Sequence, residues 1–370
     1  MANDVSTHPP LYVKLTLTLL GIMAFFTILY IGRTILVPLV FATLIAIALN
    51  PLVNKLCDLG VNRIIGIAFS VLATLAVVIG LTAFISWQAT MFSDTFSQLQ
   101  HRFDELYNQG VDWASQAFKI SKGDVNGWVN DTKQKIMDNS GAFIGKTVGT
   151  ISATLAFIFL LPVYIFMILY YKPLLLQFVA QLFPRDEHEA VLDVLNETKK
   201  LIQSYLIGLM IETAVIAVLN SIGFLAVGLQ YAILLGIIGA ILNLIPYIGG
   251  LIAISLPMIL ALATKSPTTM LVVAVIYLFV QFLDNNFLVP KVVASKVRLN
   301  ALVSIVAVLV GGALWGVMGM FLSIPLVAIA KVIFDRIQAL NPWGYLLGDD
   351  MPAITKQVFR PIRRRTKKSS

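Results

Sequence analysis

Cysteine and histidine are scarce in this sequence of 370 residues. The single cysteine, Cys57, cannot form an intrachain disulfide or a site made of several thiolates. The three histidines, His8, His101 and His188, lie outside the long apolar segments, and no H-E-x-x-H motif occurs. An intramembrane zinc protease would therefore lack its ligands, and a serine hydrolase within the membrane would lack a base. We expect no metal, no cofactor and no enzymatic activity.

Charge is also low, and apolar residues take its place. Charged residues make up 12% of the chain and hydrophobic residues 58%, whereas a soluble domain has roughly 25% charged residues. Segments such as Leu15–Ile31, Ile64–Trp87 and Val148–Tyr171 are long enough to cross a bilayer, which takes about 20 apolar residues. They are continuous rather than alternating, so they predict membrane-spanning helices and exclude a barrel.

The arrangement of these segments predicts an all-α, polytopic membrane protein with about eight transmembrane helices, some of them broken or re-entrant. One stretch, 91–146, is more polar but keeps apolar residues at helical spacing, which predicts a soluble, extracytoplasmic helical insert. We therefore divide the chain into a three-span bundle at 1–90, the insert at 91–146, a fourth span with a cytoplasmic amphipathic helix at 147–203, a transport core at 204–335 and a basic tail at 336–370.

The basic residues indicate the orientation of the chain. If the N-terminus is cytoplasmic, most lysines and arginines of the short loops fall on the cytoplasmic side, as the positive-inside rule requires. Among the short loops, only Arg33 and Lys265 fall on the opposite side. The tail holds seven basic residues and no acid over its last twenty positions, which favours anionic lipid over nucleic acid as its neighbour. We expect a multi-pass membrane protein with both termini in the cytoplasm.

Glu212 is the first of three candidate functional positions inside the apolar segments. An ionisable side chain at membrane depth is costly, so it indicates a function or a specific partner. Tyr205 precedes Glu212 by seven residues and shares nearly the same helical face. Glu212 could carry a proton or a cation, or it could pair with a lysine such as Lys200 near the cytoplasmic interface.

The second candidate is a break between two short apolar segments, with the sequence Asn243-Leu-Ile-Pro-Tyr-Ile-Gly-Gly250. Irregular backbone at membrane depth is tolerated where it lines a cavity or is buried in protein. Interrupted helices are the best sequence indicator of a transport site, although a simple turn between two spans is the alternative here. The candidate site residues of this break are Asn243, Pro246, Tyr247, Gly249 and Gly250.

The third candidate is the run Asp284, Asn285 and Asn286, which is followed by Pro290 and Lys291. Three adjacent polar side chains could coordinate a cation or bind a polar solute. Alternatively, Asp284 could pair with Lys291 as an anchor at the membrane interface. The two asparagines favour a function, because they add no pairing charge and still cost desolvation free energy.

A string of glycines joins two short apolar arms, 302–314 and 317–330, near the end of the apolar region. Small residues allow helices to approach closely, so we expect a tight hairpin that enters and leaves the membrane on one side. Packing is favoured over contact with a substrate. The residues assigned to this packing are Gly311, Gly312, Gly316, Gly319 and Pro325.

Together, the motifs at 243–250, 284–291 and 311–326 resemble the signatures of the AI-2E transporter family, also called the PerM family. The layout of the spans is similar along nearly the whole chain. The resemblance implies a bacterial inner-membrane permease. Members have been linked to export of the furanone autoinducer-2 in quorum sensing and to sodium/proton antiport, and homopentameric assembly is known in the family.

One position departs from the family pattern. Many members carry a glutamate directly before the proline of the asparagine-containing motif, and this chain has Val289 there. If that glutamate binds the coupling ion elsewhere, the resemblance implies that Asp284 takes its role here or that coupling differs.

From these observations we expect export of a small polar solute, similar to autoinducer-2, with protonation of Asp284 or Glu212 supplying the coupling. A Na⁺(Li⁺)/H⁺ antiporter is the first alternative. A non-transporting oligomeric scaffold and a channel are the others. The expected partners are membrane lipid, the solute, H⁺ or Na⁺ and further copies of the chain, with no nucleic acid.

Overall fold

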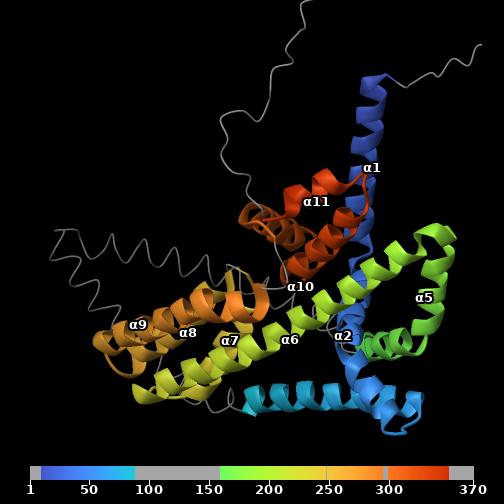
Figure 1. Ribbon diagram of the computed structural model, residues 1–370. Coiled ribbons are helices and arrows are strands. Elements are labelled where there is room, and N and C mark those ends of the chain that lie inside the picture. The colour runs from blue at the N-terminus through green and yellow to red at the C-terminus, as the bar shows by residue number, and fades with distance from the viewer. Residues whose placement is uncertain (1–9, 88–158, 247, 295–298, 350–370) are drawn as a thin grey trace, which may run out of the picture.

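The structure is a computed structural model that describes residues 10–87, 159–246, 248–294 and 299–349. All regular elements in these ranges are helices, as Figure 1 shows. The insert predicted at 91–146 and the last part of the tail lie outside the described residues. In chain order the helices are α1 (Leu11–Ile31), α2 (Arg33–Asp58), Arg63–Trp87, Phe159–Tyr170, α5 (Lys172–Gln181), the short 3₁₀-helix η1 (Arg185–Glu187), α6 (His188–Ala226), α7 (Ala232–Asn243), α8 (Ile248–Thr264), α9 (Pro267–Leu283), the π-helix η2 (Asp284–Ala294), α10 (Ala301–Arg336) and α11 (Asn341–Leu347).

Six of these helices are long and apolar enough to cross a membrane. A seventh span is possible if the pair Phe159–Tyr170 and Lys172–Gln181 crosses as one, although the pair is bent by 64°. Helix α1 has no buried residue, so its apolar side chains are available to lipid. These features confirm the prediction of an all-α, polytopic membrane protein.

Helix α6 is the long central element, 39 residues from His188 to Ala226. It is continuous through the boundary predicted between residues 203 and 204, so the amphipathic segment and the following span form one helix. Its buried residues recur every three or four positions and therefore form one stripe along the helix. The stripe contains Ile202, Tyr205, Gly208, Glu212, Ile216, Asn220, Ser221 and Phe224.

Helices α7 and α8 form a hairpin whose base lies at the C-terminal end of α6. Lys265, which follows α8, donates a hydrogen bond from Nζ to the carbonyl of Val227, at a distance of 3.0 Å. Along the hairpin, a Cβ at Gly236 of α7 would collide with Ser221, so glycine lets α7 lie directly against α6. Both ends of the hairpin therefore lie on the same side of its tip.

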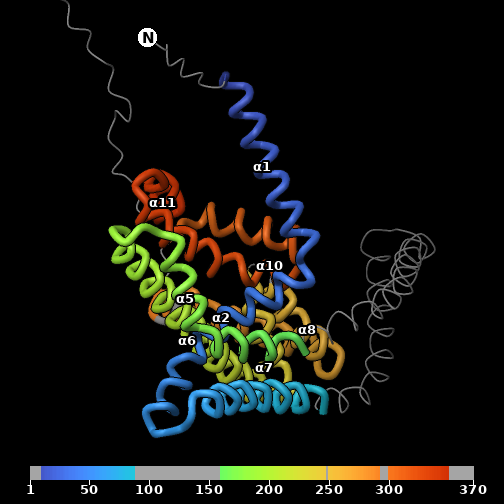
Figure 2. Tube along the Cα trace, turned by 90° about the vertical axis from the view of Figure 1, so that its right-hand side faces the viewer, coloured from blue at the N-terminus to red at the C-terminus, as the bar shows by residue number. Residues whose placement is uncertain are grey.

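Helix α10 is a second hairpin, which folds back on itself at Gly316. That glycine has φ 64° and ψ −145°, a backbone conformation that other residues rarely adopt. Figure 2 shows the two arms running side by side. The hairpin predicted from the glycine string is confirmed in its form.

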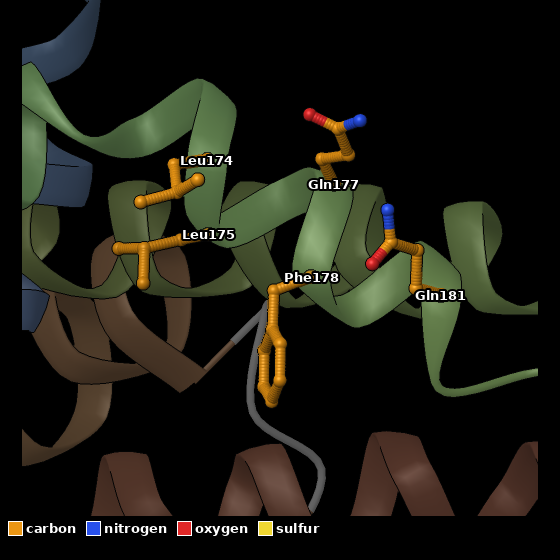
Figure 3. Close-up of a pocket in the computed structure, with 5 residues that line it drawn as sticks. All are labelled: Leu174, Leu175, Gln177, Phe178 and Gln181. Atoms are coloured by element: carbon orange, nitrogen blue, oxygen red, sulfur yellow. The ribbon is translucent and has the colours of Figure 1, made fainter.

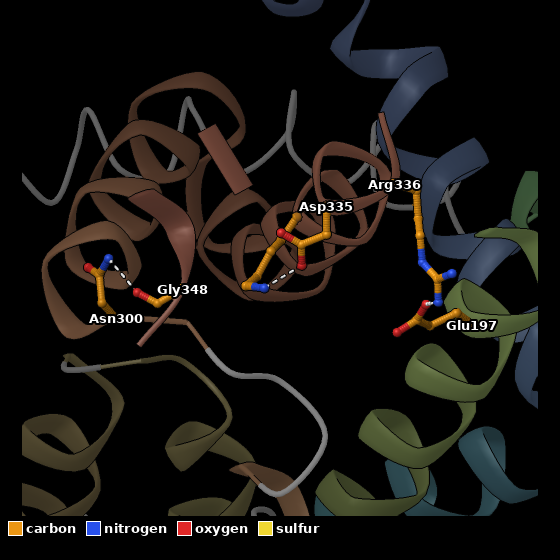
Figure 4. Close-up of polar contacts among 6 residues, drawn as sticks. Glu197, Asn300, Asp335, Arg336 and Gly348 are labelled. Carbon is orange, nitrogen blue, oxygen red and sulfur yellow. Dashed lines mark hydrogen bonds and ion pairs between the residues drawn. The ribbon is translucent and has the colours of Figure 1, made fainter. Parts of the chain in front are cut away.

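The open end of the α10 hairpin is held by polar contacts, several of which are drawn in Figure 4. Asn300 caps the first arm through Val303 N–H, and its amide donates to the carbonyls of Leu346 and Gly348 beside α11. At the end of the second arm, Arg336 donates to Glu197 of α6 with an N–O distance of 2.7 Å. Since Glu197 lies in the N-terminal half of α6, the two hairpins have their bases near opposite ends of that helix.

The turn of the α10 hairpin contacts the N-terminal helices. Trp315 donates a hydrogen bond from its indole nitrogen to the carbonyl of Leu29, one of the last carbonyls of α1. The ring of Phe321 stacks on that of Phe41 in α2 at a centroid distance of 5.5 Å. These contacts connect the predicted three-span bundle to the predicted core.

Candidate functional site

Asp284 lies at the junction between α9 and the π-helix η2 and is 1% exposed. Its Oδ2 atom accepts two amide hydrogen bonds, one from Asn243 Nδ2 at 3.1 Å and one from Gln281 Nε2 at 3.3 Å. The π-helical conformation is rare and is frequently found at functional sites. The buried carboxylate and the unusual helix therefore coincide at one position.

Asn243 reaches Asp284 because α7 ends there. Beyond it, Pro246 has no backbone N–H to continue a helix, and α8 then begins at Ile248. A Cβ at Gly249 would collide with the carbonyl of Leu242, so only glycine allows α8 to start beside the end of α7. The break thus places an amide side chain, rather than a regular turn of helix, against the carboxylate.

The start of α8 is anchored to α9 by a further hydrogen bond. Tyr277 donates from its hydroxyl to the carbonyl of Gly250 at 3.1 Å. A Cβ at Gly250 would lie 3.6 Å from the Tyr277 hydroxyl and 3.9 Å from Asn243 Oδ1, so these groups surround one small volume. The break, α9 and η2 therefore form a single polar cluster, which we call the Asp284 cluster and define as Asn243, Gly250, Tyr277, Gln281 and Asp284.

Glu212 of α6 extends the Asp284 cluster. It is 8% exposed, and it lies within electrostatic range of Asp284 where α6 packs against η2. Tyr205, seven residues earlier on the same buried stripe, is also within electrostatic range of Glu212. Two carboxyl groups from different helices thus share one low-dielectric environment.

Each of these carboxyl groups has one oxygen without a hydrogen-bond donor among the described residues, Oδ1 of Asp284 and Oε2 of Glu212. Buried acceptors are normally satisfied, and an unsatisfied one indicates a missing ion, a water molecule or a proton. No group of three His, Cys, Asp or Glu side chains suited to a metal ion occurs in the described part of the chain. A buried carboxyl oxygen without a donor can take up a proton or contact a cation.

The structure separates some of the residues that the sequence had grouped. Asn285 and Asn286 are exposed, and the Asn286 amide donates to the carbonyl of Phe282 instead of approaching the Asp284 cluster. The Nζ atom of Lys291 lies over the ring of Phe287, 5.9 Å from its centroid, so it does not pair with Asp284. Tyr247 lies outside the described residues.

Two members of the Asp284 cluster, Gln281 and Tyr277, were not anticipated from the sequence. Gln281 precedes Asp284 by three residues, so its position on the same helical face was a signal that could have identified it. Tyr277 is one further turn away on that face. On α6, Asn220 is a further buried amide, 1% exposed, whose Oδ1 atom has no donor among the described residues.

Among the glycines of α10 that were assigned to packing, Gly316 has nothing within 4 Å of its Cβ position and forms the turn, whereas Gly311, Gly312 and Gly319 lie in close contact between the two arms. A Cβ at Gly311 would collide with the carbonyl of Gly319 and with the hydroxyl of Ser323. A Cβ at Gly312 would lie 2.8 Å from a carbon of Met320. Pro325 is fully buried in the second arm. None of these contacts includes an ionisable side chain.

Comparison with known proteins gives matches along most of the chain. Residues 19–339 match the family described as "AI-2E family transporter". The chain is 26% identical to "Putative transport protein YrrI" of Bacillus subtilis over 318 residues, which cover 81% of this chain and 86% of that protein. It is 26% identical to "Putative permease PerM" of Escherichia coli over 335 residues, 84% of this chain and 90% of that protein. It is 23% identical to "AI-2 transport protein TqsA" of Escherichia coli over 321 residues, 85% and 90% of the two chains.

Proposed function

Because the chain belongs to the AI-2E family of transporters, we propose that it exports a small polar solute and that Asp284 and Glu212 couple this export to protons. The observation that carries the proposal is the buried Asp284 carboxyl group, which two amides hold through one oxygen while the other has no donor in the described part of the chain. A group held in this way can gain and lose a proton without losing its position.

The arrangement of the hairpins supports this role for the Asp284 cluster. Helices α7 and α8 bring a break in the backbone to the cluster, and interrupted helices are typical of binding sites near the middle of transporters. Two carboxyl groups in one low-dielectric site disfavour double ionisation, because like charges repel strongly there. Binding or release of one proton at Asp284 would therefore change the electrostatic environment of Glu212.

The proposal also includes a class of solute. One relative carries autoinducer-2 transport in its name, and amide and hydroxyl groups such as those of Asn243, Gln281 and Tyr277 suit a small, neutral, polyhydroxylated molecule. We therefore name a polar solute similar to autoinducer-2 as the first substrate to test.

A second candidate, Na⁺(Li⁺)/H⁺ antiport, is favoured by the same unsatisfied oxygens. Asp284 Oδ1 and Glu212 Oε2 are acceptor atoms without donors among the described residues, and a monovalent cation prefers such oxygen ligands. In this case the cation itself would be the transported species, and the amides of Asn243 and Gln281 would hold the carboxylate.

The orientation that we propose in the membrane is the one expected from the basic residues of the short loops. We propose that the protein lies in the bacterial inner membrane with both termini in the cytoplasm. Helix α1, which has no buried residue, leaves apolar surface for lipid or for further copies in a homo-oligomer, for which the family suggests a pentamer.

Flux through purified protein in liposomes tests the proposal. The wild type should move the solute when a pH gradient is imposed, and Asp284→Asn should abolish the coupled flux, because an amide cannot take up or release a proton. Glu212→Gln should weaken the pH dependence. The matched control is Asn285→Ala, which changes the adjacent exposed side chain and should leave flux unchanged.

The two candidate functions give different results in the same vesicles. Solute export predicts a solute-dependent proton flux, whereas antiport predicts that added Na⁺ or Li⁺ collapses a preset pH gradient without any solute. If folded Asp284→Asn protein keeps the flux and the pH dependence of the wild type, the Asp284 cluster is not the coupling site and the proposal is wrong.

A further inference from the structure

A second polar cluster lies away from the Asp284 cluster, where the ends of four helices meet. Lys172, the first residue of α5, donates a hydrogen bond from Nζ to Oδ1 of Asn50 in α2 at 2.9 Å. Arg63, at the start of Arg63–Trp87, donates to the carbonyl of Leu169 at 3.1 Å. These bonds join segments that are more than 100 residues apart in the sequence.

Helix α6 adds a third cation to this second cluster. Pro51 has no N–H to donate to the carbonyl of Ile47, four residues earlier, and Gln203 of α6 supplies that hydrogen bond at 2.7 Å. This contact fixes α6 against α2. Lys199 lies one turn before Gln203, and its charge acts on Lys172. We call Asn50, Arg63, Lys172 and Lys199 the basic cluster.

Within the described part of the chain, no acid forms an ion pair with the basic cluster. Arg63 and Lys199 both lie within electrostatic range of Lys172, and none of the three forms an ion pair with a described residue. The preceding acids of α6, Asp193 and Glu197, bind Arg336 instead, and Figure 4 shows the Glu197 contact. Three like charges held together without an acid are unfavourable unless an anion joins them.

Asn50 supplies an independent indication of a ligand. Its side chain is only 5% exposed, and its Nδ2 atom has no acceptor among the described residues. Because Oδ1 accepts from Lys172, the free atom is a donor, and a buried donor without an acceptor is costly. Apart from Asn50 Oδ1, which already accepts from Lys172, the side chains of the basic cluster therefore offer donors and positive charge.

We propose that the basic cluster binds a phosphate group, held by Lys172 and the Asn50 amide with Arg63 and Lys199 around it. Basic pockets at the ends of transmembrane helices are suited to anionic lipid headgroups. In the orientation proposed above, the cluster lies on the cytoplasmic side, where such headgroups are available.

The surface of α5 favours a phospholipid over free phosphate. Directly after Lys172, an open hollow of about 500 Å³ runs along α5, and Figure 3 shows its lining. Leu174, Leu175 and Phe178 contribute exposed apolar surface there. An acyl chain could lie on this surface while its phosphate is held at the start of the helix. The remaining lining residues are Gln177 and Gln181.

The experiment measures lipid binding to delipidated, full-length protein by native mass spectrometry. Phosphatidylglycerol should bind more tightly than phosphatidylcholine, whose own cation neutralises its phosphate. Lys172→Gln should weaken phosphatidylglycerol binding by about tenfold, since removing one cation and its bond to the phosphate is a loss of that order. Lys200→Gln is the matched control, because it removes an exposed lysine next to Lys199 and should change binding less than about twofold.

Asn50→Asp keeps the test independent of folding defects. The new carboxylate would pair with Lys172 inside the protein, so the fold is retained while the phosphate loses its partner and meets a like charge. Thermal unfolding of the same samples checks this. If Lys172→Gln fails to fold, Asn50→Asp and Lys199→Gln provide the comparison.

The outcomes separate the two sources of phosphate. Loss of phosphatidylglycerol binding in Asn50→Asp and Lys172→Gln but not in Lys200→Gln supports the proposal with a lipid as the source. Binding of inorganic phosphate that is lost in the same variants, without a preference for phosphatidylglycerol, supports it with free phosphate as the source. Equal losses in Lys172→Gln and Lys200→Gln, or unchanged binding in Asn50→Asp, would overturn it, as would the absence of binding by either probe.

Discussion

The α7–α8 hairpin and the α10 hairpin are built from different kinds of contact. The first ends in a polar tip, where Asn243 donates a hydrogen bond to Asp284 of the neighbouring segment. The second turns at Gly316 and closes through backbone contact between Gly311 and Gly319. No ionisable residue occurs in α10 between Ala301 and Ala330.

The difference indicates that the two hairpins have different roles. At the α7–α8 tip, burial of polar groups costs free energy and is offset by specific hydrogen bonds, which is typical of a functional site. In α10, close packing of small residues fixes the shape of the hairpin and adds no exchangeable group. Substitutions in α10 should therefore lower the stability of the fold by disturbing packing, whereas substitutions at the α7–α8 tip should act through the hydrogen bonds of Asp284.

The largest effect is expected for Gly319→Val in the α10 hairpin. The new side chain would collide with the carbonyl of Gly311 and the Cβ of Trp315, so the two arms would have to separate. We expect the free energy of unfolding to fall by about 3 kcal/mol or more, the upper range of overpacking. Thermal unfolding of purified protein, followed by circular dichroism and size-exclusion chromatography, measures this.

Gly21→Val is the control for that substitution. Gly21 lies in α1 with nothing within 4 Å of its Cβ position, so the same change should leave the melting temperature nearly unaltered. A Gly319→Val protein as stable as the wild type would show that the arms of α10 do not depend on close contact.

The second largest effect is expected for Asn243→Ala at the α7–α8 tip. It removes one of the two donors to Asp284 and should reduce the free energy of unfolding by about 2 kcal/mol, because a buried carboxylate loses a partner. The double variant Asn243→Ala with Asp284→Ala should be less destabilised than the sum of the single variants. Chemical denaturation of the three variants gives the coupling free energy.

Asn286→Ala is the matched control, since its amide only donates to the carbonyl of Phe282 on the exposed side of η2. It should change stability by less than about 0.5 kcal/mol. Additive effects of Asn243→Ala and Asp284→Ala would contradict the direct coupling between the α7–α8 tip and Asp284.

The sequence could identify the helices, the break at Asn243 and the hairpin at Gly316, because long apolar segments and glycines have strong local signals. It could not identify the partners of Asp284. Adjacent residues on a helix point in different directions, so Asn285 and Asn286 face away while Gln281, three residues earlier, faces the carboxylate. The bond to Asn243 joins residues 41 positions apart, and no local pattern records it.

The two basic residues that dissented from the predicted orientation also have structural explanations. Lys265 donates to the carbonyl of Val227 at the end of α6, where a positive charge is favoured by the helix dipole. The guanidinium of Arg33 lies over the ring of Tyr30, 4.7 Å from its centroid. A count of charges in loops treats all cations alike, whereas the structure shows that these two have local partners.

Gly316→Ala tests the backbone strain at the turn of the α10 hairpin separately from the close contacts between its arms. No atom lies within 4 Å of a Cβ built on Gly316, so the substitution adds only the strain of a non-glycine residue at φ 64°. We expect a loss of about 1 to 2 kcal/mol in the free energy of unfolding. Gly80→Ala, which also adds a Cβ in open space but within a regular helix, should be neutral or slightly stabilising by thermal unfolding.

The smallest effect is expected where the α10 hairpin is attached to α6. Arg336 contacts Glu197 and Asp193 at N–O distances of 2.7 and 3.5 Å, but all three side chains are 45 to 60% exposed. Exposed ion pairs contribute little and are screened by salt, so Arg336→Gln should lower the melting temperature slightly at low salt and not at high salt. Glu197→Gln should give the same salt dependence, and the two changes should not add, because they break one contact. Arg336→Gln could instead be strongly destabilising at every salt concentration. In that case the ion pairs to α6 stabilise the α10 hairpin as much as its glycine packing does, and the α10 hairpin would depend on polar contacts as the α7–α8 tip does.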